Sequence, residues 1–287
     1  MPWNKERITD LLLRAGEIAA RVKKDLRFEL KSDRSIVTPA DREIESLFSR
    51  ELEAPSKGSY LIGEETIGEK GEAYLRDAFL NEAFVVDPID GTAPFAHLLP
   101  NWGISVGRMD RGVLTDGAVY LPECGGGEIV LSDGPAVLEG TRRPGGWDWK
   151  ELEPERGPLN AYGLIAITQG LAKRGKVLLP NPVMVLGAAV VPLIGLLQGR
   201  FLAYIGSVKL WDIAGSLPLI LRKGFAVSVM EGAERREVTA RVEEKTYHLG
   251  ADSPKRWALR SDLVICWPDE ELRFRSSFRS GSGAPGE

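Results

Sequence analysis

The segment at residues 84–95, FVVDPIDGTAPF, constrains the fold more than any other part of this sequence. It joins a β-branched apolar run, which is typical of a buried strand, to two aspartates and then to a Gly-Thr pair. Because Pro88 fixes a backbone φ angle between them, Asp87 and Asp90 are held close together. Like charges at short range are unfavourable unless a proton or a cation neutralises them. The sequence therefore predicts a buried strand that ends at a site for protons or cations.

The composition favours divalent cations with oxygen ligands. The chain has 41 acidic residues and only two histidines, which argues against a metal site with several histidine ligands. Two metal ions about 3.5–4 Å apart are the usual arrangement for phosphoryl hydrolysis. Directly after the aspartates, Gly91 and Thr92 begin a predicted helix, and free backbone N–H groups at a helix start attract anions such as phosphate. The segment thus predicts metal ligands beside a phosphate site.

Three other places carry acid at the edge of an apolar element. Glu64 and Glu65 follow the predicted strand YLIG, Asp212 follows KLW, and Asp41 lies in TPAD. Each alone is explained equally well as a helix cap or a solvated loop end, because acid in a first helical turn suits the helix dipole. Taken together with the two aspartates of DPID, these acids favour a single carboxylate site.

A covalent phosphatase mechanism is disfavoured by the spacing of the aspartates. DGT also ends the D-x-D-G-T motif of haloacid-dehalogenase-type phosphatases, in which the first aspartate is the nucleophile. Here the spacing is D-x-x-D, and Pro88 occupies the position that this nucleophile would need. An activated water is the natural attacker instead.

The rest of the chain predicts a protein that mixes helices and sheets. Residues 4–28 have helical periodicity, and a second helix begins with Thr38 as N-cap and Pro39 as first residue. Four short strands between residues 102 and 138 indicate an antiparallel meander, and strands alternate with helices after residue 160. The predicted domains are residues 1–145 and 146–272, with a linker at 141–160 and a disordered tail at 273–287.

Bulk properties exclude several classes of protein. The net charge of −4 and the lack of a basic stripe argue against duplex nucleic acid as a partner. Two cysteines are too few for a disulfide framework. The apolar run at 183–197 is shorter than a membrane span of roughly 20 residues, so we expect a buried helix. We find no targeting segment or membrane partner and expect a cytoplasmic protein.

Three motifs in fixed order resemble a known family. GEE at 63–65, DPIDGT at 87–92 and WDIAG at 211–215 are similar to those of the inositol monophosphatase family. That family belongs to the magnesium-dependent, lithium-sensitive phosphatases, with fructose-1,6-bisphosphatase and 3′-phosphoadenosine-5′-phosphate phosphatase, a bisphosphate nucleotidase. The resemblance covers roughly residues 5–270. It implies an α+β fold, a layered αβαβα sandwich, a homodimer, and hydrolysis of a small phosphorylated metabolite.

The resemblance also implies two or three Mg²⁺ ions per site. Glu64, Asp87 and the backbone carbonyl of Ile89 would hold one ion. Asp87, Asp90 and Asp212 would hold the second. A third, weaker ion would bind at Glu64 with water.

Further roles follow for the residues around these ligands. Thr92, hydrogen-bonded to Asp41, would orient the attacking water and help to deprotonate it. Glu65 would act from the outer shell, and the backbone N–H groups of Gly91 and Thr92 would bind phosphate. Lys31 lies near the family's loop lysine, but one residue closer to the following aspartate.

The substrate side departs from the family pattern. VLGAAVV matches the family's G-T-A-A segment, so Gly187, Ala188 and Ala189 are candidate substrate contacts beside Asp212. Inositol phosphatases place a glutamate seven residues before the WD aspartate, and here that position is Ile205. We expect Ile205 to present an apolar surface to the leaving group, unless its strand points it into the core.

Several substrates and one alternative without catalysis remain open at this point. LPNWG at 99–103 is similar to LPxWG of histidinol-phosphatase members of the family. Histidinol phosphate, fructose 1,6-bisphosphate and a 3′-phosphorylated nucleotide are therefore alternatives to an inositol phosphate. A catalytically silent dimeric binding protein would be favoured if a metal carboxylate were missing, and none is missing.

Overall fold

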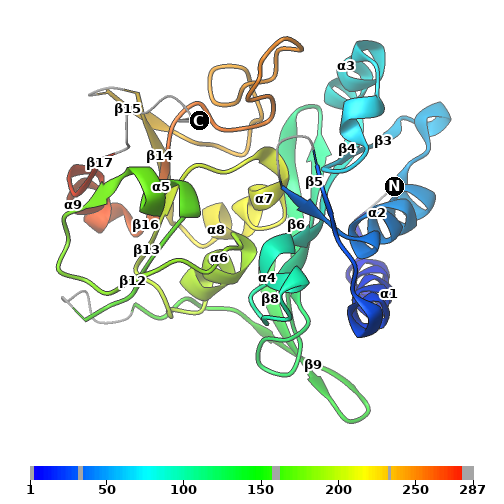
Figure 1. Ribbon diagram of the computed structural model, residues 1–287, viewed down its shortest axis with the longest axis horizontal. Coiled ribbons are helices and arrows are strands. Elements are labelled where there is room, and N and C mark those ends of the chain that lie inside the picture. Colours follow the sequence, from blue (N-terminus) through cyan, green and yellow to red (C-terminus); the bar gives the residue numbers. More distant parts are fainter. Residues whose placement is uncertain (1–2, 32–34, 157–161, 232–233, 280–287) are drawn as a thin grey trace.

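The computed structural model describes residues 3–31, 35–156, 162–231 and 234–279, which form five stacked layers (Figure 1). Helices α1 (Lys5–Val22) and α2 (Pro39–Leu52) cover the outer face of a seven-stranded sheet. Helices α6 (Val190–Leu197), α7 (Leu210–Ala214) and α8 (Leu217–Arg222) lie between this sheet and a six-stranded one. Helices α5 (Gln169–Arg174) and α9 (Glu271–Ser276) cover the far side. This order confirms the αβαβα sandwich.

The first sheet contains the strands that the sequence predicted. Its order is β3 (Ser59–Gly63), β4 (Glu82–Asp90), β5 (Gly103–Asp110), β6 (Val113–Leu121), β7 (Glu128–Asp133), β8 (Ala136–Arg143) and β9 (Gly146–Glu151). β3 and β4 are parallel, and the other neighbours are antiparallel. Since parallel strands point the same way, the acids that follow β3 and those that end β4 reach the same edge of the sheet.

The linker prediction for residues 141–160 is wrong over residues 141–151. β8 continues to Arg143, and β9 pairs with it beyond the predicted boundary at residue 145. Trp147 and Trp149 alternate along β9, and their ring centroids stack 5.6 Å apart. This period-two aromatic pattern is typical of a strand, and it outweighs the polar and Gly-rich composition. Residues 157–160 lie outside the described residues.

The N-terminal helices form as predicted. Asn4 caps α1 by accepting a hydrogen bond from Arg7 N–H at 2.8 Å. Thr38 is the N-cap of α2, and Asp41 closes a capping box on it. Between α1 and α2, a two-stranded ribbon pairs β1 (Glu29–Leu30) with β2 (Ile36–Val37).

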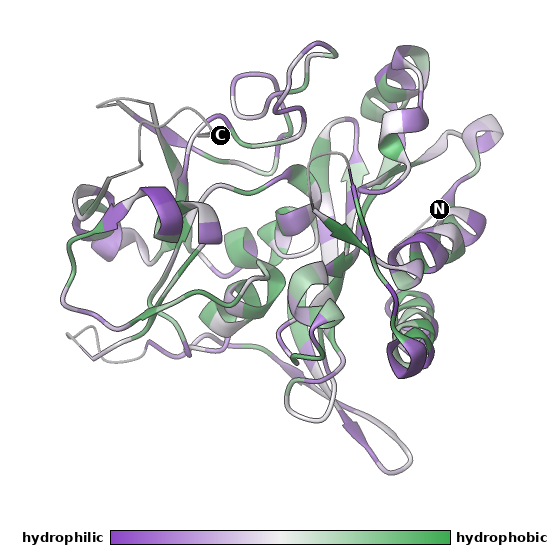
Figure 2. Ribbon diagram, viewed as in Figure 1, coloured by the Kyte–Doolittle hydropathy of each residue, from purple (hydrophilic) through white to green (hydrophobic). Residues whose placement is uncertain are grey.

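The second sheet has the order β12-β10-β13-β16-β14-β15. These strands are β12 (Val183–Met184), β10 (Ile165–Ile167), β13 (Ala203–Gly206), β16 (Leu263–Cys266), β14 (Ala226–Glu231) and β15 (Glu234–Glu237). The predicted buried helix is α6, which Figure 2 shows as strongly apolar between the two sheets. No helix of the described residues is long and apolar enough to cross a membrane.

The predicted disordered tail at 273–287 is wrong over residues 273–279. Phe274 of α9 is fully buried, and β17 (Phe278–Arg279) pairs with β11 (Lys176–Val177). Burial of these two phenylalanines outweighs the Ser-rich and Arg-rich composition of the segment, because each buries a large apolar area. Residues 280–287 lie outside the described residues. The remaining helices are α3 (Glu72–Leu80) and α4 (Thr92–Ala96), with short 3-10 turns at Lys23–Asp25, Pro55–Lys57, Ile67–Glu69 and Pro268–Glu270.

Candidate active site

Asp87, Asp90 and Asp212 converge between the two sheets. One carboxylate oxygen of each lies within 4.8 Å of the others. In a regular strand, residues three apart point to opposite faces. Between Asp87 and Asp90, however, β4 contains a register shift, so that these residues pair with Ser105 and Gly103. This bulge allows both carboxylates to face Asp212, which projects from the first turn of α7.

The cluster has the properties of a divalent cation site. Asp87 Oδ1 is buried and has no hydrogen-bond partner among the described residues. Asp90 Oδ2 accepts from Val190 N–H at 2.5 Å, and Asp212 Oδ2 accepts from Lys209 N–H at 2.7 Å. Burial and repulsion from neighbouring acids raise the pKa of Asp87 and Asp90, and burial and repulsion from Glu64 raise the pKa of Asp212 to about 7. A bound cation would stabilise the ionised carboxylates, so these residues fit the metal that the sequence predicted.

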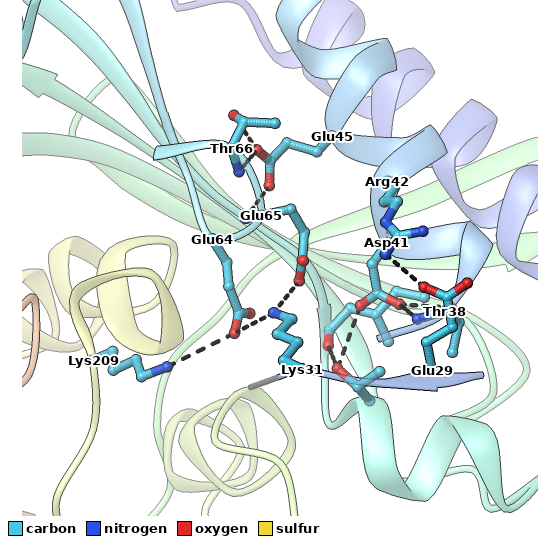
Figure 3. Close-up of polar contacts among 12 residues, drawn as sticks. Glu29, Lys31, Thr38, Asp41, Arg42, Glu45, Glu64, Glu65, Thr66 and Lys209 are labelled. Carbon is cyan, nitrogen blue, oxygen red and sulfur yellow. Dashed lines mark hydrogen bonds and ion pairs between the residues drawn. The ribbon is translucent and has the colours of Figure 1, made fainter. Parts of the chain in front are cut away.

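Glu64 and Glu65 follow β3, and their carboxylates form ion pairs with lysines (Figure 3). Lys31 Nζ lies 2.6 Å from Glu65 Oε1 and 3.6 Å from Glu64 Oε1. Lys209 Nζ approaches Glu64 Oε1 to 4.0 Å from the other side. Glu64 still lies close enough to raise the pKa of Asp87 by charge repulsion. The structure thus places Lys31 at the site and adds Lys209, which sequence reasoning missed.

Glu45 supports this turn and was also missed. Its carboxylate accepts from the N–H groups of Glu65 and Thr66, both at 2.8 Å, and from Thr66 Oγ1 at 2.5 Å. A side chain on Gly63 would collide with the Glu45 carboxylate, so glycine is required before the two glutamates. The available signal was an acid on the apolar face of α2, one residue after the fully buried Ile44.

Thr92 and Asp41 form the contact that the resemblance implied. Thr92 Oγ1 lies 3.3 Å from Asp41 Oδ1 and 3.0 Å from the carbonyl oxygen of Ile89. A hydroxyl has one hydrogen, so it donates to one of these acceptors at a time. Asp41 Oδ2 accepts from Thr38 N–H at 2.8 Å and from Thr38 Oγ1 at 2.6 Å. Burial raises the pKa of Asp41 to about 7.

A pocket of about 240 Å³ opens beside the aspartate cluster. Gly187, Ala188 and Ala189, which the sequence analysis named as candidate substrate contacts, line it. A Cβ on Gly91, whose φ is 87°, would lie 2.7 Å from the Cβ of Ala188, so the Gly-Thr turn packs against this segment. The full lining comprises Asp90, Ile167, Thr168, Gln169, Gly170, Gly187, Ala188, Ala189, Tyr204, Ser207, Val208 and Asp212.

The prediction that Ile205 faces the leaving group is wrong. Ile205 is fully buried and packs with Leu171 of α5 and Phe274 of α9 on the outer side of the second sheet. Tyr204, the preceding residue of β13, lines the pocket instead. Successive side chains of a strand point to opposite faces, so of two neighbouring residues one faces the core and the other faces the pocket.

Comparisons with known proteins agree with this architecture. The profile of the inositol monophosphatase family matches residues 5–149, half of this chain. A histidinol-phosphatase of Mycobacterium tuberculosis is 35% identical over 98 residues, which cover 34% of this chain and 35% of that protein. Human inositol monophosphatase 1 is 28% identical over 123 residues, 42% of this chain and 43% of that protein. The match therefore spans less than half the length of these two relatives.

Longer matches have lower identity. Mouse inositol monophosphatase 2 is 25% identical over 254 residues, which cover 84% of this chain and 85% of that protein. An IMPase of Thermotoga maritima superimposes with a TM-score of 0.66 at 20% identity, covering 94% of this chain and 96% of the other. An IMPase/NADP phosphatase complexed with Mg²⁺ and phosphate superimposes with a TM-score of 0.67 at 17% identity, covering 94% of this chain and 93% of the other. These solved structures share the fold, and with the family profile they establish that the chain belongs to the inositol monophosphatase family.

Proposed function

We propose that this protein is a Mg²⁺-dependent phosphomonoesterase that hydrolyses a small phosphorylated metabolite with an activated water. One observation carries the proposal. Three carboxylates, two of them buried and that of Asp212 partly buried, converge within 4.8 Å beside the Thr92–Asp41 hydrogen bond, and one of their oxygens has no partner among the described residues. A structural core has no use for such an arrangement, because it lowers stability unless a ligand binds.

The metal ligands of the proposal are those that the resemblance implied. Asp87, Asp90 and Asp212 would hold Mg²⁺ together, and Glu64 with the carbonyl of Ile89 would complete the ligand set. Bound Mg²⁺ supplies polarisation of the phosphate, stabilisation of the leaving alkoxide and a lowered pKa of bound water. Glu64 would have to exchange its lysine contacts for a metal contact. The ion count of two or three belongs to the proposal.

The protein's own groups would prepare the water. When the Ile89 carbonyl is engaged elsewhere, the Thr92 hydroxyl donates to Asp41, and its oxygen is then an acceptor for a water O–H. Asp41 is fixed by Thr38, so the direction of this acceptor is set before substrate binds. A pKa of about 7 suits Asp41 to take up a proton at neutral pH. Glu65 would act from outside this pair through Lys31.

The substrate would span the aspartate cluster and the adjacent pocket. The backbone N–H groups of Gly91 and Thr92 would bind the phosphate, next to the carboxylates. The leaving group would then extend toward Gly187, Ala188 and Ala189, which line the pocket. Asp212, which belongs to both the cluster and the pocket lining, would contact the substrate where the two parts meet.

A phosphate-release assay tests the proposal. The panel contains inositol 1-phosphate, histidinol phosphate, fructose 1,6-bisphosphate and 3′-phosphoadenosine 5′-phosphate, each with Mg²⁺ and with EDTA. We expect hydrolysis of at least one substrate, its loss in EDTA and its recovery when Mg²⁺ is added back. Absence of turnover on the whole panel would support the silent binding protein, and turnover that survives EDTA would contradict the metal.

Lithium sensitivity and a homodimer complete the proposal. Both come from family membership. Inhibition of phosphate release by LiCl but not by KCl, and a mass near twice 31.4 kDa in light scattering, are the expected results.

A further inference from the structure

A second pocket lies between α3 and the loop of residues 238–262, which Figure 1 shows beside each other. Its volume is about 280 Å³, and it shares no lining residue with the pocket at the aspartates. Five of its eight lining residues are apolar, and the other three are Glu72, Arg76 and Arg256. The proposed phosphatase chemistry gives this pocket no role.

One wall of this second pocket is aromatic. The rings of Phe79 and Trp257 are nearly parallel, with 10° between their planes and 6.4 Å between their centroids. Trp257 has a φ of 73°, in the left-handed region that bulky side chains rarely adopt. Its N–H donates to the carbonyl of His248 at 2.6 Å, and its carbonyl accepts from Leu210 N–H at 2.9 Å. These bonds hold a strained backbone in place, and such strain is concentrated at functional sites.

The charged residues of this pocket leave one positive charge unpaired. The two carboxylate oxygens of Glu72 accept from Arg256 Nη1 at 2.7 Å and from Nη2 at 3.0 Å. Arg256 Nε also donates to the carbonyl of Leu249 at 2.9 Å. Arg76, one turn after Glu72 on α3, forms no hydrogen bond or ion pair with any residue that the structure describes. Its guanidinium can therefore bind an anion at the edge of the aromatic wall.

We propose that this pocket is an effector site for a small aromatic carboxylate. A flat ring can pack on Phe79 and Trp257, while a carboxylate accepts two parallel hydrogen bonds from the guanidinium of Arg76. One arginine balances the single charge of a carboxylate, whereas a phosphate monoester carries about −1.5 to −2 charges at pH 7. The volume of about 280 Å³ lies near the lower end of ligand pockets, roughly 300 Å³, which fits a molecule of one or two rings.

Trp257 connects the effector site to α7, the helix that carries Asp212 of the aspartate cluster. Leu210, which donates to the Trp257 carbonyl, is the first residue of α7. The rings of Trp211 and Trp257 lie 6.2 Å apart. A ligand packed on Trp257 therefore holds the segment that fixes the start of α7. We expect it to raise the affinity of the cluster for Mg²⁺ by at least about 5-fold, within the usual range of coupling between sites.

Titration calorimetry of the full chain in EDTA tests binding, since no metal is then present to attract a carboxylate to the aspartates. The probes are indole-3-acetate, indole-3-acetamide, which lacks the charge, and acetate, which lacks the ring. We expect one indole-3-acetate to bind per chain. Both other probes should bind at least about 10-fold more weakly, because each lacks either the charge-assisted hydrogen bond or the buried ring. Absence of indole-3-acetate binding, or equal binding of the amide, overturns the inference.

Two variants at exposed positions should change the affinity for indole-3-acetate in opposite directions. Arg76→Gln should weaken binding by about 10-fold, because it removes the charged donor. Glu72→Gln frees Arg256 for the anion and should strengthen binding by about 2–5-fold. A folding defect cannot produce this pair of results, because it would weaken binding in both variants. Arg143→Gln, at the exposed end of β8, is the matched control. Wild-type affinity in Arg76→Gln overturns the inference.

Mg²⁺ titrations with and without saturating indole-3-acetate test the coupling. An affinity raised by at least about 5-fold supports the effector role, and Mg²⁺ should raise the affinity for indole-3-acetate by the same factor, because coupling is reciprocal. The rise should disappear in Arg76→Gln. An unchanged Mg²⁺ affinity, or a rise that persists in this variant, overturns the effector role. None of these measurements requires hydrolysis, so failure of the phosphatase proposal would not decide them.

Discussion

The two ends of the site differ in charge. At the end proposed to bind phosphate, three aspartates lie close together, and burial and repulsion raise the pKa of each. At the end proposed to bind the leaving group, Gln169, Tyr204 and Ser207 are uncharged, and small residues lie at 187–189. The charges of the first end destabilise the fold unless protons or a cation neutralise them, whereas the second end is neutral. Changes at the first end should therefore alter rate and stability, and changes at the second should alter preference.

The largest expected effect comes from removing a carboxylate of the cluster. Asp87→Asn or Asp90→Asn should lower phosphatase activity by at least about 10³-fold, because a bound metal contributes several kcal/mol of transition-state stabilisation. Phosphate release measured at saturating Mg²⁺ checks this. Asp148→Asn, at an exposed position of β9, is the control and should keep full activity. An Asp90→Asn enzyme of normal rate would contradict the metal assignment.

The same variants should become more stable than the wild type in EDTA, and increasingly so as pH rises. The folded-state pKa of each aspartate is raised above an unfolded value near 3.9. Such a group stabilises the fold fully below pH 4 and loses this contribution as pH rises through the folded pKa, about 7 for Asp212. The advantage of Asp87→Asn in urea unfolding should therefore grow between pH 5 and pH 8. A constant difference would contradict the repulsion argument.

The next largest effect is expected from Thr92 and Asp41, the pair proposed to activate the water. Thr92→Ala should lower kcat by about 10²–10⁴-fold with little change in KM, since general-base assistance is typically worth that factor. Asp41→Asn should give a similar loss, because an amide keeps the contact with Thr38 but is a poor proton acceptor. Steady-state kinetics of the double variant decides whether the two act as a unit. Losses that multiply would show that Asp41 serves only the start of α2.

The two ends also differ in how far the sequence could predict them. Charged chemistry needs particular residue types at fixed spacing, so DPIDGT, GEE and WDIAG marked the acids that the structure brings together. The neutral pocket uses common residues, and its identity depends on which face of β13 a side chain occupies. The structure shows that Tyr204 faces the pocket and Ile205 the core, and the resemblance in motifs alone could not supply this orientation.

The fold shows the same limit. Strands and helices with strong periodicity were predicted to within a few residues, whereas β9 and α9 were missed, because tertiary packing of Trp147, Trp149 and Phe274 overrides polar composition there. Lys209 and Glu45 were missed for a related reason. Their contacts with the GEE turn join segments far apart in sequence, and the local pattern around them is that of ordinary helical residues.

A smaller effect at the charged end concerns Lys209. Its ammonium group lies 4.0 Å from Glu64, where it competes with a cation for that carboxylate. At this distance two charges in water interact by roughly 1 kcal/mol, so Lys209→Met should raise the apparent Mg²⁺ affinity by about 5-fold. Titration calorimetry at low ionic strength measures this, and added salt should shrink the difference. Lys150→Met removes another lysine–carboxylate pair, 2.8 Å from Glu139 and outside the site, and should leave the affinity unchanged.

The smallest effect separates core from pocket most directly. Ile205→Val removes one methylene from the cluster of Ile205, Leu171 and Phe274, so it should cost about 0.5–1.5 kcal/mol of unfolding free energy. Since this side chain lies on the outer face of the sheet, the ratio of kcat/KM for inositol 1-phosphate to kcat/KM for phenyl phosphate should stay at the wild-type value. Tyr204→Phe, one residue away, should change that ratio. Denaturant unfolding and the substrate ratio, measured on both variants, test this directly: if Ile205→Val shifts the ratio, the side chain reaches the leaving group, and the division between the two faces of β13 is wrong.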